Sequence, residues 1–353
     1  QGLVFVVTGG CGFLGSHLVR LLLQEEPELR ELRVFDLHPD PSVIPPGQGR
    51  ARPTLGGQLW GWDPQMWGTG GHGGYMGLGR VDVWGRSSPQ AMARVNVQGT
   101  KNVIRGCVAG GVSCLIFTSS MEVLGPNSRQ DPFFRGDEDT PYPVRHCEPY
   151  PLGKAQAERL VLEANGSPVA GGGRLLTLSL RPTGIYGEGH PLLPLFYQQG
   201  RAAGGWLPRT LPPHAEHGRV YVGNVAWMHV VASRRARLAP SSVAGDYFFC
   251  YDGSPRAPYD QFTALLLGLR FGGPLRPPRP LLALLAWLNQ LLGPLYRALG
   301  VAAPLLNPYT LAVASTPFSL QTSKAQRCFG YQPQFDWDEA RDRTQRWLRG
   351  VFG

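Results

Sequence analysis

Tyr150 and Lys154 stand four residues apart in PYPLGKAQAERLVLEA and are the clearest candidates for chemistry in the chain. Residues at this spacing share a face of a helix, and Pro151 suits a first helical turn because its missing N–H is not needed there. A tyrosine, with a pKa of about 10, is no base at neutral pH unless a positive charge stabilises its phenolate. The pair predicts that Tyr150 accepts a proton and that the Lys154 ammonium lowers its pKa. Similar pairs also occur on solvated helix surfaces.

An apolar segment, SCLIFTSSMEVLG, precedes this pair and ends at Ser119 and Ser120. It predicts a buried strand that delivers hydroxyl groups at its carboxyl end. The first residues, LVFVVTGG, predict another buried parallel strand. Since Leu3 already belongs to this strand, we expect the natural chain to begin before Gln1.

A glycine turn and a helix follow the first strand in TGGCGFLGSHLVRLLL. The glycines let the backbone approach a pyrophosphate, and the helix start supplies free N–H groups and a positive dipole end. The flanking strand and helix are the context that this motif requires. We therefore expect cofactor contacts from Gly9, Gly12, Phe13, Leu14 and Gly15.

Asp36 ends the next strand, LRVFD, about 20 residues after Gly15. A carboxylate at this place accepts hydrogen bonds from a ribose 2′-hydroxyl and repels a 2′-phosphate. The sequence therefore favours NAD over NADP. An incidental surface aspartate after a glycine turn is the alternative.

The composition excludes several other classes of protein. The 353 residues carry a net charge of +9, but the arginines are scattered without a basic run, which argues against nucleic-acid binding. No pair among the six cysteines has metal-ligand spacing, so we expect no metal site. Free thiols on the reducing side of a membrane are the expected state.

Together these motifs resemble the extended short-chain dehydrogenase/reductase family, and VNVQGTKNV, LRPTGIYGEG and RVYVGNVAWMHV add to the match. The resemblance implies an α/β fold, a Rossmann-type doubly wound parallel sheet in residues 1–190 with a smaller, mostly C-terminal substrate lobe in 191–353. Residues 219–235 would return to the first domain. Ser120 matches the family's substrate-hydroxyl serine, Asn96 its proton-relay asparagine, and Lys154 also binds the cofactor. VGNVA departs from relatives that carry two aspartates before the Val-Ala.

The apolar segment Leu281–Leu295 helps to decide between branches of that family. It is shorter than the ~20 residues of a spanning helix, and Asn289-Gln290 interrupt it. Flanking arginines at 276, 279 and 297 suit an interfacial helix whose basic side chains reach lipid headgroups. A buried helix of the substrate lobe is the alternative. We expect the protein on the cytosolic face of the endoplasmic reticulum membrane.

Residues 1–38 and 81–353 resemble the 3β-hydroxy-Δ5-steroid dehydrogenase/isomerase family, and within it the branch that acts on C27 sterols in bile-acid synthesis. TSSMEVLGPN, PYPLGKAQAE, EHGRVYVGNVAWMH and APLLNPYTLAVA carry this resemblance. It implies NAD-dependent oxidation of the 3β-hydroxyl of a 7α-hydroxylated Δ5 sterol, with movement of the double bond to Δ4. A nucleotide-sugar epimerase and an inert membrane-associated scaffold are the alternatives, and a homo-oligomer is compatible with the sequence.

The isomerisation needs a base, for which Asp252 in YDGSP is our candidate. Steroid enzymes of the family often have two aspartates there, whereas this chain has Asp252-Gly253. A turn-forming Asp-Gly is therefore an equally good interpretation.

The segment from Pro39 to Arg80 departs from the family, which has a strand, a helix and a strand there. The residues are rich in Gly, Trp and Met instead, and these amino acids share G-rich codons. We hypothesise a translated non-coding or misframed stretch; a real flexible insertion is the alternative. A real insertion would damage the cofactor domain and underlies the scaffold hypothesis.

Overall fold

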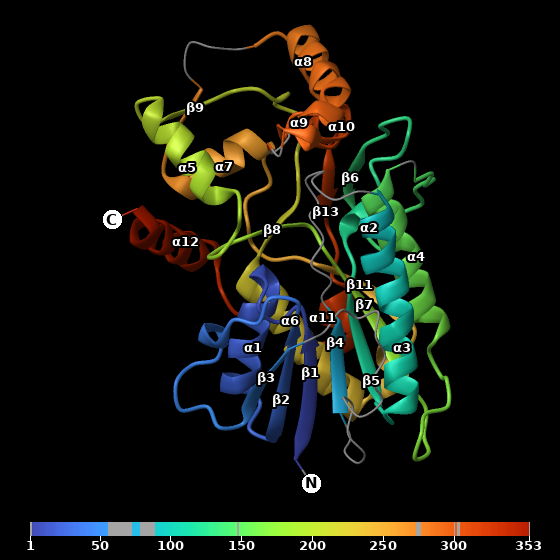
Figure 1. Cartoon of the computed structure of the whole chain (residues 1–353). Helices are drawn as coiled ribbons and strands as arrows, with labels where there is room; N and C mark the ends of the chain where they lie inside the picture. Colours follow the sequence, from blue (N-terminus) through green and yellow to red (C-terminus); the bar gives the residue numbers. More distant parts are fainter. Residues whose placement is uncertain are drawn as a thin grey trace.

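The computed structural model of the chain describes residues 2–55, 73–77, 89–146, 148–272, 277–299, 301 and 304–352. Within these residues seven strands form one sheet in the order β11-β7-β5-β4-β1-β2-β3, and every neighbouring pair is parallel (Figure 1). The order reverses beside β1, which is the hallmark of a doubly wound Rossmann sheet. The predicted α/β class is confirmed.

The strands of this sheet are β1 (Leu3–Thr8), β2 (Leu29–Asp36), β3 (Ala51–Leu55), β4 (Gly73–Gly77), β5 (Cys114–Thr118), β7 (Leu176–Pro182) and β11 (Asp246–Cys250). The helices that belong to it are α1 (Phe13–Glu25), α2 (Pro89–Ala93), α3 (Gly99–Ala109), α4 (Pro149–Glu163), α6 (Val222–Leu238) and α11 (Lys324–Phe329).

Two apolar cores cover the two faces of the sheet, because successive side chains of a strand point to opposite faces. Phe5 and Val7 pack with the helices α1 and α6, whereas Val6 packs with α3 and α4. In β5, Ile116 joins the first core and Leu115 joins the second. The continuous apolar runs of the sequence are thus strands buried on both faces, as expected for a parallel sheet.

A smaller lobe lies beyond the carboxyl ends of the strands, at the top of Figure 1. Its helices are α5 (Leu193–Ala202), α7 (Tyr259–Leu267), α8 (Arg279–Leu291), α9 (Gly293–Ala298) and α10 (Pro308–Ser315). The last helix, α12 (Trp337–Phe352), packs on α5 and α7. Short strand pairs complete the structure: β8 (Gly184–Tyr186) with β10 (Arg219–Tyr221), β9 (Trp206–Pro208) with β12 (Arg270–Gly272), and β6 (Phe133–Gly136) with β13 (Phe318–Leu320).

The C-terminal half returns to the sheet more than once. Helix α6, which lies within residues 219–238, packs against α1. Strand β11 extends the sheet beside β7, and α11 packs on β11, although the sequence assigned both to the substrate lobe. The chain therefore crosses between the lobes more than once. These crossings fix the position of one lobe on the other.

The segment Pro39–Arg80, which we call the anomalous segment, contains two strands of the sheet, β3 and β4. The glycine-rich strand β4 (GGYMG) pairs with β1 and β5 in the middle of the sheet. Residues 56–72 and 78–88 lie outside the described part, so the hypothesis on the origin of this segment stays a prediction.

Candidate active site

The glycine turn after β1 has the geometry of a dinucleotide-binding turn. Gly9 has a φ of 67°, which favours glycine, and Gly12 N–H donates to the Gly9 carbonyl at 3.0 Å. A Cβ on Gly15 would lie 2.1 Å from Gly9 O, so α1 can start this close to the turn only with glycine. Gly12 caps α1 without a side-chain bond, which leaves the first N–H groups, at Phe13 and Leu14, free for an anionic group.

Asp36 is held directly over this turn. Its Oδ2 accepts from Cys11 N–H at 3.0 Å, and its Oδ1 accepts from His38 N–H at 3.1 Å. The carboxylate is 6% exposed, so it is no incidental surface residue. The turn, the helix start and the carboxylate together fit the pyrophosphate and the adenosine ribose of NAD.

We predict that Asp36→Ala narrows the preference for NAD over NADP by about 10-fold to 100-fold, because a charge repulsion and hydrogen bonds to the ribose are lost. The measurement is the ratio of kcat/KM for the two cofactors. Asp36→Asn is the matched control, since it removes the charge but keeps an acceptor for Cys11 N–H. An unchanged ratio in Asp36→Ala would show that Asp36 does not read the ribose.

Ser120, Tyr150 and Lys154 meet at the carboxyl end of β5. The hydroxyl groups of Ser120 and Tyr150 are hydrogen-bonded, and Ser120 Oγ also accepts from Glu122 N–H at 3.1 Å. The Lys154 ammonium donates to the Thr118 carbonyl at 3.0 Å. The structure thus places these three predicted site residues at the same strand end, and their catalytic roles stay a prediction.

The pKa of Tyr150 is shifted upward, whereas the sequence predicted a downward shift. Burial raises it, the nearby Glu122 carboxylate raises it further, and the bond with Ser120 lowers it. Burial also lowers the pKa of Lys154 to about 8, against the opposing charge of Glu158. In the protein alone Tyr150 is therefore a neutral phenol, and Lys154 does not by itself turn it into a base.

Asn96 lies in a π-helical turn, Arg94–Gln98, between α2 and α3. It is 3% exposed, and its amide nitrogen has no hydrogen-bond partner among the described residues. A Cβ added to Gly153 would lie 3.2 Å from that nitrogen, so Asn96 packs directly on the helix that carries Tyr150 and Lys154. A single π-turn often marks a functional site, and an unpaired buried donor next to Lys154 suits a proton relay.

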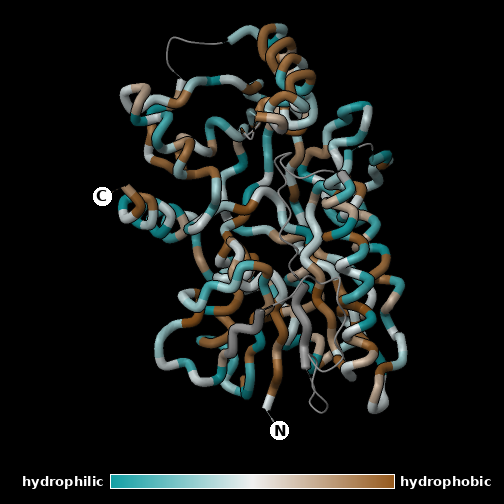
Figure 2. Tube along the Cα trace, in the orientation of Figure 1, coloured by the Kyte–Doolittle hydropathy of each residue, from teal (hydrophilic) through white to brown (hydrophobic). Residues whose placement is uncertain are grey.

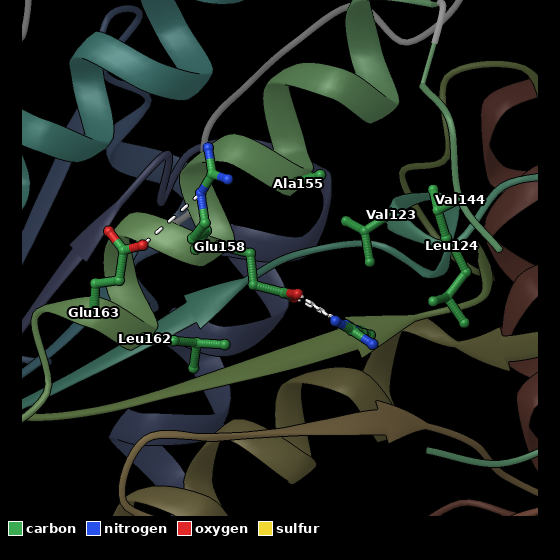
Figure 3. A pocket seen from close by; sticks show the side chains of 9 residues that line it. Val123, Leu124, Val144, Ala155, Glu158, Leu162 and Glu163 are labelled. Atoms are coloured by element: carbon green, nitrogen blue, oxygen red, sulfur yellow. Dashed lines mark hydrogen bonds and ion pairs between the residues drawn. The ribbon is translucent and has the colours of Figure 1, made fainter. Parts of the chain in front are cut away.

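A buried ion pair anchors α4 to the sheet. Glu158 accepts from Arg181 Nε at 3.0 Å and from the Ser179 hydroxyl at 2.8 Å. The pair lines a pocket between α4 and the strand β7, together with Val123, Leu124 and Leu162 (Figure 3). This pocket contains none of the predicted site residues. The ion pair of Glu158 and Arg181 fixes α4 on the sheet, and with it the positions of Tyr150 and Lys154.

Glu122, which the sequence analysis missed, is the strongest additional candidate. It follows Ser120 by two residues, influences the pKa of Tyr150 and accepts a hydrogen bond from the Tyr309 hydroxyl of α10. Burial raises the pKa of Glu122, and the bond from Tyr309 lowers it. The motif TSSMEV contained the signal, since this carboxylate lies in the short turn Met121–Val123 that follows the end of β5.

Asp252 is placed differently. Its carboxylate accepts from Tyr221 N–H at 2.8 Å, from the Asn224 amide at 2.9 Å and from Ser254 N–H at 2.9 Å. The last bond is an Asx turn, which matches the turn-forming alternative. No contact with Ser120 or Tyr150 is found in the described part of the chain, so the role of Asp252 as a base remains a prediction.

A wall of polar side chains connects Tyr150 to the smaller lobe. We call Glu122, Tyr150, Arg219, Tyr259 and Tyr309 the polar wall. All five are half-buried. The wall therefore brings groups of the smaller lobe, such as Tyr309 and Tyr259, into electrostatic contact with Glu122 and Tyr150 at the end of β5.

Comparison with known proteins decides the family. The model of the 3-beta hydroxysteroid dehydrogenase/isomerase family matches residues 6–47 and 75–276. The chain is 53% identical to human 3 beta-hydroxysteroid dehydrogenase type 7, covering 100% of this chain and 97% of the relative. The chain belongs to this family. A 3 beta-hydroxysteroid dehydrogenase/Delta 5-->4-isomerase of vaccinia virus strain Ankara is 39% identical and covers 98% of both chains.

Solved structures support the same fold. A UDP-galactose 4-epimerase aligns with a TM-score of 0.65 at 20% identity, over 99% of this chain and 100% of the other. MoeE5 in complex with UDP-glucose and NAD aligns with a TM-score of 0.68 at 20% identity, over 99% of both chains. These similarities show the fold alone. The family model leaves residues 48–74 unmatched, which lie within the anomalous segment.

Proposed function

We propose that this NAD-dependent 3β-hydroxysteroid dehydrogenase oxidises the 3β-hydroxyl of a Δ5 sterol of the 7α-hydroxycholesterol type and moves its double bond to Δ4. The observation that carries the proposal is the hydrogen-bonded pair of Ser120 and Tyr150 at the end of β5. Lys154 and Asn96 lie beside this pair, and the glycine turn with Asp36 lies at the neighbouring end of β1. Names of relatives support the steroid class.

The residues divide the oxidation between them. Ser120 orients the substrate hydroxyl, and Tyr150 accepts its proton. Lys154, still largely protonated at neutral pH, stabilises the phenolate at the moment of transfer. Asn96 next to Lys154 passes the proton onward. NAD, when bound, supplies the hydride acceptor and a positive charge that favours the Tyr150 phenolate.

Isomerisation requires a group that removes a C4 proton and returns a proton at C6. The new 3-ketone makes the C4 protons acidic, because the carbanion delocalises as a dienolate through the Δ5 bond. Glu122 is adjacent to Tyr150 on the polar wall, and its raised pKa brings it closer to neutral, where a carboxyl group exchanges protons most effectively. Asp252, with its three hydrogen bonds, is the weaker candidate on geometry.

We predict that Glu122→Gln slows formation of the conjugated enone by about 100-fold or more relative to NADH, because the proton acceptor is removed. Both signals are followed by absorbance in one reaction. Asp252→Asn is the companion variant, and we expect a lower melting temperature with little change in the enone rate. If Asp252→Asn slows the enone and Glu122→Gln does not, the base is Asp252.

Membrane association is a second part of the proposal. In α8 only Ala286 is buried, and most apolar residues of α8 and α9 are exposed, including Leu284, Trp287 and Leu291 at 52%, 53% and 56%. Figure 2 shows this hydrophobic helix at the outer end of the smaller lobe. Of the polar interruption, Asn289 donates to the Leu306 carbonyl at 2.9 Å and so faces protein, whereas Gln290 is exposed. The buried-helix alternative thus does not describe α8.

No described helix has both the length and the apolar character needed to cross a bilayer. We propose instead that α8 lies in the interface of the endoplasmic reticulum membrane on its cytosolic face. Arg279 at the start of α8 would reach lipid headgroups, and Trp287 suits the interface. A sterol that partitions into the bilayer would then be close to the substrate lobe.

We predict that changing Leu284, Leu288 and Leu291 together to Ser lowers partitioning into lipid vesicles by about 100-fold or more. All three side chains are exposed, so the fold loses little packing. Vesicle flotation measures the effect. Leu238→Ser is the control, because Leu238 is 82% exposed at the end of α6, away from the proposed membrane surface. Unchanged flotation of the triple variant would place the anchor elsewhere.

The test of the proposed activity is NADH production from NAD with 3β-hydroxy-Δ5 sterols. The epimerase alternative predicts thermal stabilisation by UDP-sugars and none by sterols. The scaffold alternative predicts no binding of NAD at millimolar concentration in calorimetry. NADH formation with 7α-hydroxycholesterol supports the proposal, and its absence with every 3β-hydroxy-Δ5 sterol contradicts it.

A further inference from the structure

Arg219 is half-buried, its Nε is fully covered, and its positive charge has no acidic partner among the described residues. No ion pair of Arg219 exists within the described residues, and its Nε has no hydrogen-bond partner there. The guanidinium stacks on the ring of Tyr259, with Cζ 3.5 Å from the ring centroid. A buried charge without a partner is costly, so such a site is expected where a ligand supplies the missing acceptor.

The surroundings hold this guanidinium in one place. A Cβ on Gly184 would lie 2.1 Å from Nη1 of Arg219, so glycine at this position makes room for the side chain. The guanidinium also lies 5.2 Å from the ring centroid of Phe262. The stacking on Tyr259 and the gap left by Gly184 form a built site rather than a surface arginine that happens to be covered.

His217 supplies a second unpaired polar atom next to Arg219. It is 3% exposed, its ring centroid lies 4.3 Å from that of Tyr259, and its Nε2 has no partner in the described part of the chain. Burial and the charge of Arg219 lower the pKa of His217 to about 3, so the imidazole is neutral. A neutral imidazole donates or accepts a hydrogen bond, whereas a guanidinium only donates.

Tyr259 links this pair to the reaction centre. The charges of Arg219 and of Glu122 both act on the Tyr259 phenol, and Glu122 acts on Tyr150. Arg219 and His217 therefore contact a tyrosine whose phenol also responds to the charge of Glu122, the carboxylate that acts on Tyr150.

We propose that Arg219 and His217 bind a second oxygen function of the sterol, carried beyond the 3β-hydroxyl, and so determine the preference for a hydroxylated substrate. The inference rests on the proposed sterol oxidation and assigns the hydroxyl at C7 to this pair. Arg219 donates to that oxygen, and His217 bonds to the same group. A sterol without the second hydroxyl leaves both polar atoms unsatisfied, which disfavours its binding.

The experiment compares kcat/KM for 7α-hydroxycholesterol and cholesterol in the wild type and in two variants. Arg219→Met removes the guanidinium but keeps the stem. His217→Phe keeps the ring on Tyr259 and removes both nitrogens, so it serves if Arg219→Met fails to fold. We expect the ratio of the two kcat/KM values to fall about 10-fold to 100-fold in each variant. Arg201→Met, an exposed arginine of the same lobe, is the control and should keep the wild-type ratio.

Two outcomes would overturn the inference alone: no preference for 7α-hydroxycholesterol in the wild type, or an unchanged ratio in both folded variants. A wild type that oxidises neither sterol would instead contradict the proposed function on which the inference rests. Melting temperature and NAD affinity establish that each variant is folded.

Discussion

Tyr150→Phe is expected to lower kcat by about 1,000-fold while NAD affinity stays close to the wild-type value, because only the proton acceptor is lost. Phenylalanine keeps the ring and removes the hydroxyl that bonds to Ser120. NAD titration by calorimetry and NADH formation in steady state separate the two effects.

Ser120→Ala is the matched comparison, since it removes the partner of the same hydrogen bond but leaves the tyrosine. We expect a smaller loss, because the substrate hydroxyl is then misplaced while its proton acceptor remains. If Tyr150→Phe retains turnover within tenfold of the wild type, Tyr150 is not the base.

Gly15→Ala is expected to reduce NAD affinity by about 100-fold or more, since part of the pyrophosphate binding at the helix start is lost. The added Cβ would lie 2.1 Å from Gly9 O and 2.6 Å from Gly10 Cα, so the start of α1 must move away from the turn. Calorimetry with NAD measures the loss.

Gly350→Ala is the control for this substitution. Gly350 lies in α12, and a Cβ there meets no atom within 4 Å. The control should bind NAD like the wild type and melt at the same or a higher temperature. If Gly15→Ala binds NAD with the wild-type affinity, NAD binding does not depend on this turn.

The sequence predicted the parts of the site that depend on local geometry. The strand, glycine turn and helix around Gly15, and the placement of Tyr150 and Lys154 on one helix, follow from glycine chemistry and helical spacing. The position of Asp36 over the turn follows from the length of the helix between two parallel strands.

Contacts between segments that are distant in the sequence could not be predicted from local geometry. Glu122 and Tyr309 are 187 residues apart and meet only because α10 packs over the end of β5. The bonds of Asp252 to Tyr221 and Asn224 depend in the same way on the return of α6 to the sheet. The sign of the Tyr150 pKa shift was also missed, because burial and the Glu122 carboxylate both raise this pKa.

The anomalous segment bears on every activity prediction. Strand β4 occupies the centre of the sheet with three glycines among its five residues, and glycine is poorly suited to a strand interior. We predict that the natural transcript encodes a different sequence between codons 39 and 80. A transcript that encodes the present segment would contradict this, and the activity measurements should then use the chain as given.

The most direct test of the central claim is to follow the hydrogen at C3. A 3β-hydroxy-Δ5 sterol that carries deuterium at C3, such as labelled 7α-hydroxycholesterol, is incubated with the protein and NAD, and the reduced cofactor is analysed by mass spectrometry. We predict that NADH contains one deuterium per molecule and forms in equal amount with the 3-ketone, and that Tyr150→Phe forms neither product at a comparable rate. NADH without deuterium, or a 3-ketone formed without NADH, would contradict hydride transfer from C3 at this site.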